Sequence, residues 1–339
     1  MTSALPLADL DLRLLDGFQR DFPLVPAPFA VVAGRLGTSE GAVLDALRRL
    51  SATGEVSRVG AVFRPGAVGA STLAALAAAA DELPALARLV GAFPEVSHNY
   101  ERENAWNLWF VASAADAERL DTVLGAIESR AGRRVLRLPL VEEYHIDLGF
   151  RLDGSGGPRA VADAPRAPAP AAITPRERRL VGTLQAGLAL VPRPYAALAA
   201  ASGMTEAAVL ATLARWQAEG TVRRFGVIVR HRELGFAANA MAVWDVPDAD
   251  VARAGLRLAR EPRVTLAYRR ARSLPDWPYN LYCMVHGRER AEVAATLAAA
   301  AARAGLGGRP HAVLFSRRRF KQTGARAARG EAAWTRSTA

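Results

Sequence analysis

An internal duplication constrains this sequence more than any other feature. Residues 24–30, LVPAPFA, return as residues 190–196, LVPRPYA, after a shift of 166 positions. The same shift, without a gap, pairs Gly37 with Gly203, Glu40 with Glu206, Val43 with Val209, Leu47 with Leu213, Gly54 with Gly220, Arg58 with Arg224, Gly60 with Gly226 and Gly69 with Gly235. Solenoid repeats are about 20–50 residues long. A longer repeat that occurs twice therefore predicts two copies of one domain pair.

Composition narrows the class of protein. The 339 residues are 51% hydrophobic, enough for substantial cores. The single cysteine, Cys283, excludes a disulfide framework and a structural zinc site built from cysteines. No apolar run approaches the roughly 20 residues that span a bilayer, and the first residues lack the pattern of a secretory signal. We predict a soluble, cytoplasmic protein.

The charge is divided unevenly between the copies. Residues 1–150 contain 14 Lys and Arg against 19 Asp and Glu, a net charge of −5. The total of +11 leaves 30 against 14, a net of +16, for residues 151–339. Such a basic half is typical of a protein that binds nucleic acid or a small polyanion such as a polycarboxylate. The charge alone leaves both alternatives open.

Each copy reads as two modules, which gives an α+β fold. Three short helices and an extended wing predict a winged helix-turn-helix over residues 1–66 and again over 174–232. The order β-α-β-β-α-β, a ferredoxin-like arrangement, follows over 67–152 and 233–324. A Gly-, Pro- and Ala-rich linker, 153–173, joins the copies, and an Ala- and Arg-rich tail covers 325–339. We expect the copies to form an intramolecular pseudo-dimer through their sheets.

The strand and helix pattern sets the limits of these elements. In the first copy we predict strands at 71–78, 96–102, 106–112 and 135–150, with helices at 82–93 and 116–131. In the second copy we predict strands at 238–246, 264–269, 279–285 and 311–321, with helices at 249–260 and 289–304.

The candidate recognition helices are poorly suited to DNA. Glu40 and Asp45 lie on the first, and Glu206 with several alanines on the second. Base readout needs Arg, Asn or Gln in the first turns, and carboxylates repel phosphates. We therefore predict no specific DNA binding and a scaffold role for these modules.

Aromatic, basic and imidazole side chains gather in the β-rich modules. Residues 97–109, SHNYERENAWNLW, and 266–286 hold three of the six tryptophans and four of the six tyrosines. Flat rings stack on planar ligands, and arginines grip carboxylates with two hydrogen bonds. The pattern favours a large planar ligand that bears carboxylates. The candidate binding residues are Arg102, Asn107, Trp109, Tyr268, Arg270, Trp277, Tyr279, Asn280, Tyr282 and His286.

The last predicted strand of each copy adds two further candidates. When Tyr144 is aligned with Phe320, His145 falls at the position of Lys321. A His and a Lys at equivalent positions can donate to a carboxylate, or serve as a proton source and a charge clamp.

Several of these motifs together resemble the siroheme decarboxylases of the Lrp/AsnC superfamily, in their fused NirD–NirL form. The most specific are HNYER at 98–102 and WPYNLY at 277–282, supported by GEVSRVGAV at 54–62 and the closing Phe320 and Lys321. The resemblance covers nearly the whole chain except the linker and tail. The first copy departs from WPYNLY, since it reads AWNLW at 105–109. The copies are thus not expected to be catalytically equivalent.

The resemblance implies removal of CO₂ from two acetate side chains of siroheme, to give 12,18-didecarboxysiroheme for haem d1 or an alternative haem. His98 or His145 would donate the proton, with Tyr100, Tyr268 and Tyr279 as secondary hydrogen-bond donors. Arg102, Arg270 and Lys321 would clamp carboxylates. No cofactor is implied, because the macrocycle carries the electrons and brings its own iron. Ligation of that iron is a competing role for His98 or His145.

Two other functions remain open at this level: an Lrp-like transcription regulator and a haem-binding sensor without catalysis. The implied partner is siroheme, with neither specific DNA nor a membrane. The sequence also leaves open a homodimer or association with related decarboxylase subunits.

Overall fold

The computed structural model describes residues 8–146, 173–230, 233–236 and 238–324. The tail at 325–339, the linker up to residue 172 and the end of the strand predicted at 135–150 lie outside these ranges. The predicted domain boundaries stay predictions. No single described helix is long and apolar enough to cross a membrane, and one pair of helices, Pro194–Ser202 and Glu206–Ala218, passes that test only together, bent by 97°.

Both winged helix-turn-helix modules form as expected. Pro28 and Pro194 stand in the first turn of the second helix of each copy, where a missing N–H costs nothing. Gly37 and Gly203 end these helices with φ of 66° and 68°, a conformation that favours glycine. Ser39 and Thr205 cap the following helices. The elements are α1 (Asp9–Gly17), α2 (Pro28–Leu36), α3 (Glu40–Thr53), β1 (Val56–Phe63), α6 (Pro175–Leu184), α7 (Pro194–Ser202), α8 (Glu206–Ala218) and β6 (Val222–Val229).

The two wings pair with each other. β1 and β6 form an antiparallel two-stranded sheet in which Gly60 lies opposite Gly226. A Cβ added at Gly226 would lie 2.4 Å from the carbonyl oxygen of Gln19, so the turn after α1 packs directly on the wing of the other copy. The turn after α6 packs on β1 in the same way, and Leu188 donates to the carbonyl of Val59 at 2.7 Å. One apolar core is shared by the two winged helix-turn-helix modules, which together we call the roof.

Each ferredoxin-like module forms the predicted β-α-β-β-α-β order. In both copies the second, third, first and fourth strands lie side by side in that order. The elements of the first copy are β2 (Ala70–Leu76), α4 (Leu83–Ala92), β3 (Val96–Arg102), β4 (Leu108–Ala114), α5 (Ala117–Ala131) and β5 (Leu136–Ile146). Those of the second are β7 (Ala238–Trp244), α9 (Val251–Ala259), β8 (Val264–Arg270), β9 (Leu281–Gly287), α10 (Arg290–Ala304) and β10 (His311–Gln322).

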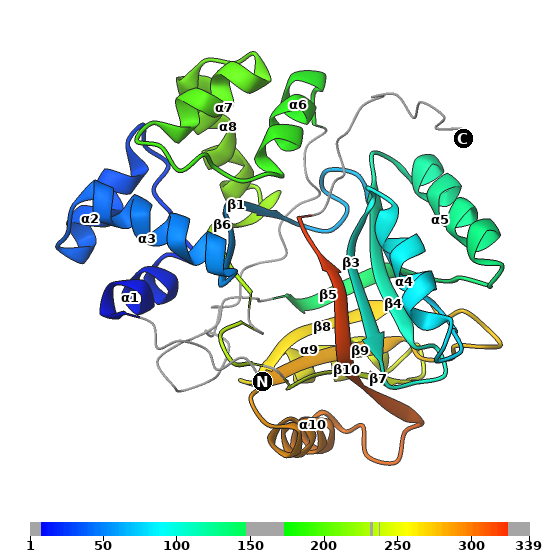
Figure 1. Cartoon of the computed structure of the whole chain (residues 1–339). Helices are drawn as coiled ribbons and strands as arrows, with labels where there is room; N and C mark the ends of the chain where they lie inside the picture. The colour runs from blue at the N-terminus through cyan, green and yellow to red at the C-terminus, as the bar shows by residue number, and fades with distance from the viewer. Residues whose placement is uncertain (1–7, 147–172, 231–232, 237, 325–339) are drawn as a thin grey trace.

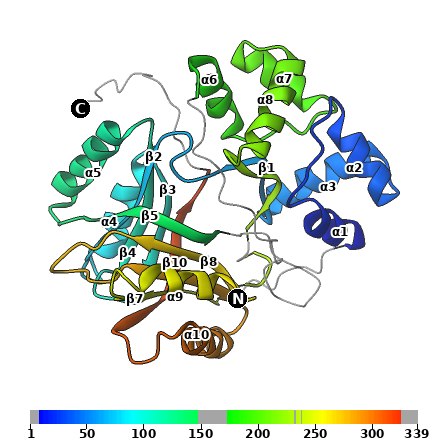
Figure 2. The ribbon, with the colours of Figure 1, turned by 180° about the vertical axis from the view of Figure 1, so that it is seen from behind.

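The two four-stranded sheets close into one barrel. The fourth strand of each copy pairs with the second strand of the other, β5 with β8 and β10 with β3. This is the pairing between copies that the duplication predicts. Helices α4 and α5 pack outside the first copy's strands, and α9 and α10 outside the second copy's. Figures 1 and 2 show the roof helices on one side of the molecule, the barrel on the other, and β1 and β6 between them.

The observed third strands begin later than predicted. We expected strands from residues 106 and 279, but β4 begins at Leu108 and β9 at Leu281. In both copies the preceding asparagine, Asn107 or Asn280, uses its side chain to bond a backbone segment beyond the first strand. The aromatic residues just before it therefore lie in a loop.

Candidate active site

A cavity of about 470 Å³ lies between the roof and the inside of the barrel. Its volume falls in the usual range for small-molecule sites. Seven of the predicted site residues line it: His98, Tyr100, Arg102, Trp109, Tyr268, Arg270 and His286. Both copies and both kinds of module contribute to it. The site predicted from the β-rich segments is therefore also lined by residues of the wings β1 and β6.

Positive charge dominates the lining of this cavity. Six arginines line it, and no acidic side chain of the described residues does; the arginines are Arg58, Arg64, Arg102, Arg224, Arg270 and Arg319. Arg319 forms an ion pair with Glu233, at the edge of the site. Burial lowers the pKa of Arg102, because desolvation disfavours a charge. Much of the remaining lining is apolar, including Phe63, Phe110 and Ile146. Such a cavity suits a flat apolar ligand with several anionic arms.

Two tyrosine–arginine pairs face the cavity at equivalent places in the copies. The guanidinium of Arg102 lies 5.8 Å from the ring centroid of Tyr100, and that of Arg270 lies 4.7 Å from the ring of Tyr268. Each arginine donates to a carbonyl of the other copy, Leu314 at 3.1 Å and Leu138 at 2.7 Å respectively. These bonds fix the direction of each guanidinium. The predicted clamps Arg102 and Arg270 are thus held in position before a ligand binds.

Two histidines in the cavity are each held by a hydroxyl group. Nδ1 of His98 lies 2.9 Å from Ser97 Oγ, and Nδ1 of His286 lies 3.0 Å from Thr265 Oγ1. Burial, then the charge of Arg58, lowers the pKa of His98 to about 4. Burial, then the charge of Arg102, lowers the pKa of His286 to about 4. Both imidazoles are therefore neutral near pH 7 in the free protein.

The two histidines do not occupy equivalent positions. Ser97 and Thr265 correspond, because Ser97 contacts the carbonyl of Val111 and Thr265 that of Met284, which lie at matching places. His98, however, follows Ser97 on β3, whereas His286 comes from the neighbouring strand β9. The cavity therefore presents imidazoles in an arrangement that the duplication does not repeat.

Three aromatic residues of the second copy lie beneath the cavity and do not line it. Trp277 and Tyr282 are buried inside the barrel, where Trp277 Nε1 donates to Tyr282 Oη at 2.7 Å. The rings of Trp109 and Trp277 meet edge to face at 5.1 Å, and Tyr279 packs against Trp277 at 4.9 Å. Tyr282 stacks beneath Tyr268. Trp277, Tyr279 and Tyr282 thus support the cavity from below without lining it.

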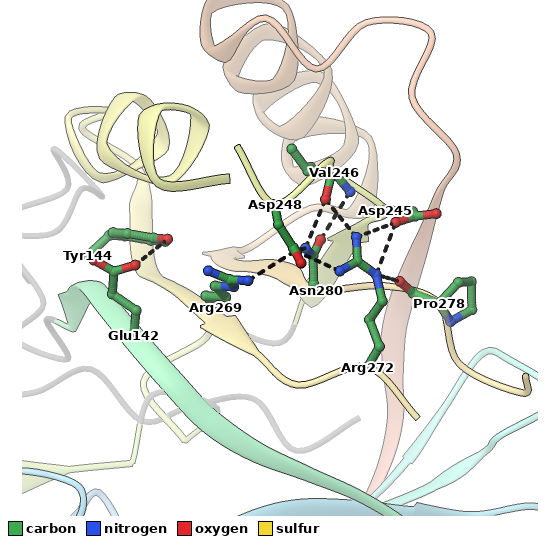
Figure 3. Close-up of polar contacts among 9 residues, drawn as sticks. All are labelled: Glu142, Tyr144, Asp245, Val246, Asp248, Arg269, Arg272, Pro278 and Asn280. Carbon is green, nitrogen blue, oxygen red and sulfur yellow. Dashed lines mark hydrogen bonds and ion pairs between the residues drawn. The ribbon is translucent and has the colours of Figure 1, made fainter. Parts of the chain in front are cut away.

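Both predicted binding asparagines are structural. Asn107 bonds both the N–H and the carbonyl of Ala78, at 2.9 and 2.8 Å. Asn280 does the same with Val246, at 3.0 and 2.8 Å. Neither lines the cavity. Figure 3 shows Asn280 beside Arg272, which bonds Asp245, Asp248 and the carbonyl of Pro278 and so fixes the loop that carries Trp277.

Asn280→Ala should therefore lower stability before it affects binding. The substitution leaves the buried N–H of Val246 without its partner, and a buried group that loses its partner costs about 1–3 kcal/mol. The carbonyl of Val246 loses one of two donors and keeps Arg272 Nη2 at 2.7 Å. Urea unfolding of the variant should show a clearly lower midpoint than the wild type. Asn104→Ala, which removes one hydrogen bond from a half-buried side chain, is the matched control. An unfolding midpoint for Asn280→Ala equal to that of the control would contradict this assignment.

The structure does not support the predicted roles of His145 and Lys321. Lys321 donates to the carbonyls of Gly91 and Phe93 at 2.7 and 2.9 Å, and so caps the end of α4. His145 lies opposite Ala267, next to a bulge between β5 and β8 that breaks the simple alternation of side chains. Neither residue lines the cavity. The second cavity imidazole is that of His286.

Comparison with known proteins decides the family. A model of the AsnC-like ligand binding domain matches residues 67–145 and 233–321, and a model of the siroheme decarboxylase NirDL-like HTH domain matches 11–56 and 177–223. The siroheme decarboxylase NirDL subunit of Paracoccus denitrificans (strain Pd 1222) is 50% identical over 94% of this chain and 97% of its own length. The chain belongs to the siroheme decarboxylase family. It is a fused member, with both copies in one chain.

This siroheme decarboxylase family member is also similar to a solved structure and to a shorter relative. A crystal structure of the siroheme decarboxylase NirDL in complex with an iron-uroporphyrin III analogue superposes with a TM-score of 0.66 at 29% identity, covering 95% of this chain and 94% of that one. The single-copy siroheme decarboxylase NirH subunit of Paracoccus pantotrophus is 43% identical over 44% of this chain and 93% of its own length.

Sequence reasoning missed the roof arginines as site residues. Arg58 and Arg224 correspond under the shift of 166 positions, and both line the cavity from the paired wings. The repeated wing segments, VSRVG at 56–60 and VRRFG at 222–226, contain a signal, because the arginine recurs two residues before a glycine in both. A wing is usually interpreted as a DNA contact, so its arginines were not assigned to a small-molecule site.

Proposed function

We propose that this protein is a carboxy-lyase that removes CO₂ from two acetate side chains of siroheme and gives 12,18-didecarboxysiroheme, for the synthesis of haem d1 or of an alternative haem. The observation that carries the proposal is the cavity of six arginines and two imidazoles without a carboxylate among its described lining residues. Siroheme is a flat macrocycle with carboxylate arms. Arginine forks bind such arms in pairs of hydrogen bonds.

The chemistry needs a proton and an electron sink but no further cofactor. A proton added to the ring carbon next to the one that bears the acetate makes the ring accept the electron pair of the breaking C–CO₂ bond. CO₂ leaves and an exocyclic methylene forms; this carbon takes up a proton and becomes a methyl group, while the ring carbon gives its proton back. Each loss of CO₂ therefore consumes one proton overall. The macrocycle supplies the sink. The protein supplies the proton, the clamps and a partly desolvated carboxylate.

His98 and His286 are the proposed proton donors, with Tyr100 beside His98 at a ring separation of 6.3 Å as a secondary donor. Both imidazoles are neutral in the free cavity because their pKa values are about 4. A bound polycarboxylate places negative charge beside them and favours the protonated form. We therefore propose that the imidazoles become protonated, and so able to act as acids, when the substrate binds. The same imidazoles are candidates for contact with the iron that siroheme brings.

One experiment tests the function directly. Purified protein is incubated anaerobically with siroheme, and the products are analysed by mass spectrometry. We expect loss of two CO₂ per macrocycle. Siroheme that is bound, by its absorbance shift, but recovered unchanged would favour a haem sensor without catalysis.

DNA binding should be weak and without sequence preference. Glu206 at the start of α8 forms an ion pair with Arg193, and Asp45 on α3 one with Arg48 at 2.8 Å. Carboxylates at these places repel phosphates and occupy nearby cations. An electrophoretic or footprinting assay at physiological salt should show no protected site. A defined footprint would instead support a transcription regulator.

The proposed partners follow from the relatives. Single-copy relatives named as NirD, NirL and NirH subunits exist, and we propose that this chain also associates with such subunits or with itself. The cytoplasmic location stays a prediction.

A further inference from the structure

A second, polar cavity of about 260 Å³ adjoins the first. We call it the annex. It is bounded by the wing β1, the end of α6 and the end of β10, and its lining residues are Ser57, Arg58, Gly182, Gln185, Ala186, Arg230, Gln322, Thr323 and Gly324. Six of these nine residues also line the main cavity, so the two spaces are continuous. Arg58 lies at their junction.

Arg58 runs through the annex in a cradle of glycines. A Cβ added at Gly187 would lie 2.7 Å from Arg58 Cβ, and one at Gly324 would lie 3.2 Å from Arg58 Nη1. Nη2 donates to the carbonyl of Ala61 at 3.1 Å, whereas the buried Nε has no hydrogen-bond partner among the described residues. Burial lowers the pKa of Arg58 to about 10. A buried guanidinium without a carboxylate is costly unless an anion joins it.

Arg230 supplies a second positive charge to the annex. Its Nη1 donates to the carbonyl of Gly54 at 3.2 Å, which directs the guanidinium along the end of α3. No acidic side chain of the described residues lines the annex. Two guanidiniums in one polar pocket can each donate charge-assisted hydrogen bonds to a single carboxylate.

The two sides of the roof carry different residues at the annex. Under the shift of 166 positions, Arg58 and Arg230 correspond to Arg224 and Arg64 in the other half of the roof. There, the positions of Gly182 and Gly187 are taken by Asp16 and Asp21. Glycine at both positions, where the other half has acids, leaves space beside Arg58 and places no negative charge there. The two copies therefore differ in sequence at the annex.

We propose, on the basis of the proposed function, that the annex is a carboxylate subsite in which Arg58 and Arg230 bind one carboxylate side chain of the macrocycle. The carboxylate would reach past the main cavity and fix the macrocycle relative to the roof. It would also neutralise Arg58, the guanidinium whose charge acts on His98. The subsite thus links correct placement of the substrate to protonation of His98.

Arg58 is the charged group that acts on His98. Ser97 holds Nδ1 from the same strand, Gln322 of β10 and Val111 of β4 lie opposite in the register, and Tyr100 stacks on the ring. None of these four side chains is charged near pH 7. Loss or neutralisation of the Arg58 charge should therefore raise the pKa of His98.

Equilibrium binding of metal-free uroporphyrin III, an octacarboxylate tetrapyrrole, tests the subsite without turnover. We expect Arg58→Gln and Arg230→Gln each to raise the Kd about 10- to 100-fold, since a hydrogen bond to a charged group contributes that much. In the double variant the Kd should rise by less than the product of the two single increases, because both arginines bind the same carboxylate. Arg317→Gln removes an exposed charge from β10 and is the matched control.

The second measurement follows His98 itself by NMR of labelled imidazole. In the wild type, uroporphyrin III should raise the pKa of His98, and in Arg58→Gln this ligand-induced rise should become smaller, because the charge that the carboxylate would neutralise is already absent. Arg58→Lys keeps the positive charge and should retain part of the ligand-induced rise in the pKa of His98. This variant therefore separates loss of charge from misfolding. Binding by both Gln variants as tight as that of the Arg317→Gln control would overturn the subsite. Failure of the wild type to decarboxylate siroheme, with the arginine dependence intact, would overturn the proposed function alone.

Discussion

Replacement of His98 by Ala should lower the rate of formation of the doubly decarboxylated product by about 10²–10⁴-fold, the usual contribution of a general acid. Siroheme binding should change little, because the arginines that hold the carboxylates are untouched. Single-turnover decarboxylation and an absorbance titration of siroheme on the same variant separate the two effects.

Two other histidines serve as controls for this prediction. His311 is exposed at the start of β10, so His311→Ala should behave like the wild type. His145→Ala distinguishes the sequence-based assignment from the structural one, because His145 does not line the cavity. Loss of activity in His145→Ala with normal activity in His98→Ala would reverse our assignment. A His98→Ala protein that lost only the spectral shift on binding would make His98 an iron ligand.

The order of the elements was predictable because the duplication supplies the same pattern twice. Glycines that end helices, such as Gly37 and Gly203, and the prolines at helix starts fix the limits of the roof helices from local chemistry alone. Pairing between the copies also follows, since each ferredoxin-like sheet leaves edge strands that need partners. Local sequence and the need to satisfy edges thus specify most of the fold.

The direction of individual side chains was not predictable in the same way. His145 and Lys321 do occupy equivalent positions, opposite Ala267 and Asn99, after matching bulges in β5 and β10. Neither lines the cavity, because such bulges displace the simple alternation of side chains along a strand. Asn107 and Asn280 looked like ligand contacts because they stand among aromatic residues, yet both bond backbone groups. One extra residue in a strand moves the following side chains to the opposite face. Register is set by tertiary pairing, which the sequence pattern does not show.

The roof arginines show a second limit. Arg58 and Arg224 approach the barrel only because β1 and β6 pair across the two copies. Neither wing alone predicts that it will face a cavity. Their recurrence after 166 positions was visible, but its meaning depended on the pairing of domains far apart in the sequence.

Replacement of His286 by Ala should stop the reaction after one CO₂ has been lost. His98 and His286 come from different strands of different copies and do not correspond under the duplication. Under the duplication His98 corresponds to Leu266, and His286 to Ser113. Two imidazoles at unrelated places in one cavity can each lie against a different ring of a fixed macrocycle. Each imidazole would then donate the proton for the loss of one acetate's CO₂, and the macrocycle would not have to rotate in the cavity between the two steps.

The products of the two variants distinguish this division of labour from its alternatives. We expect His286→Ala to accumulate a singly decarboxylated siroheme, with the second loss of CO₂ slowed about 10²–10⁴-fold. His98→Ala should accumulate the other isomer, separable by chromatography and identified by mass spectrometry. Thr265→Ala, which removes the hydroxyl that holds His286 Nδ1 at 3.0 Å, should slow the same step as His286→Ala but by a smaller factor. Accumulation of the same isomer in both histidine variants would mean that one imidazole protonates both rings and that the other only positions the macrocycle.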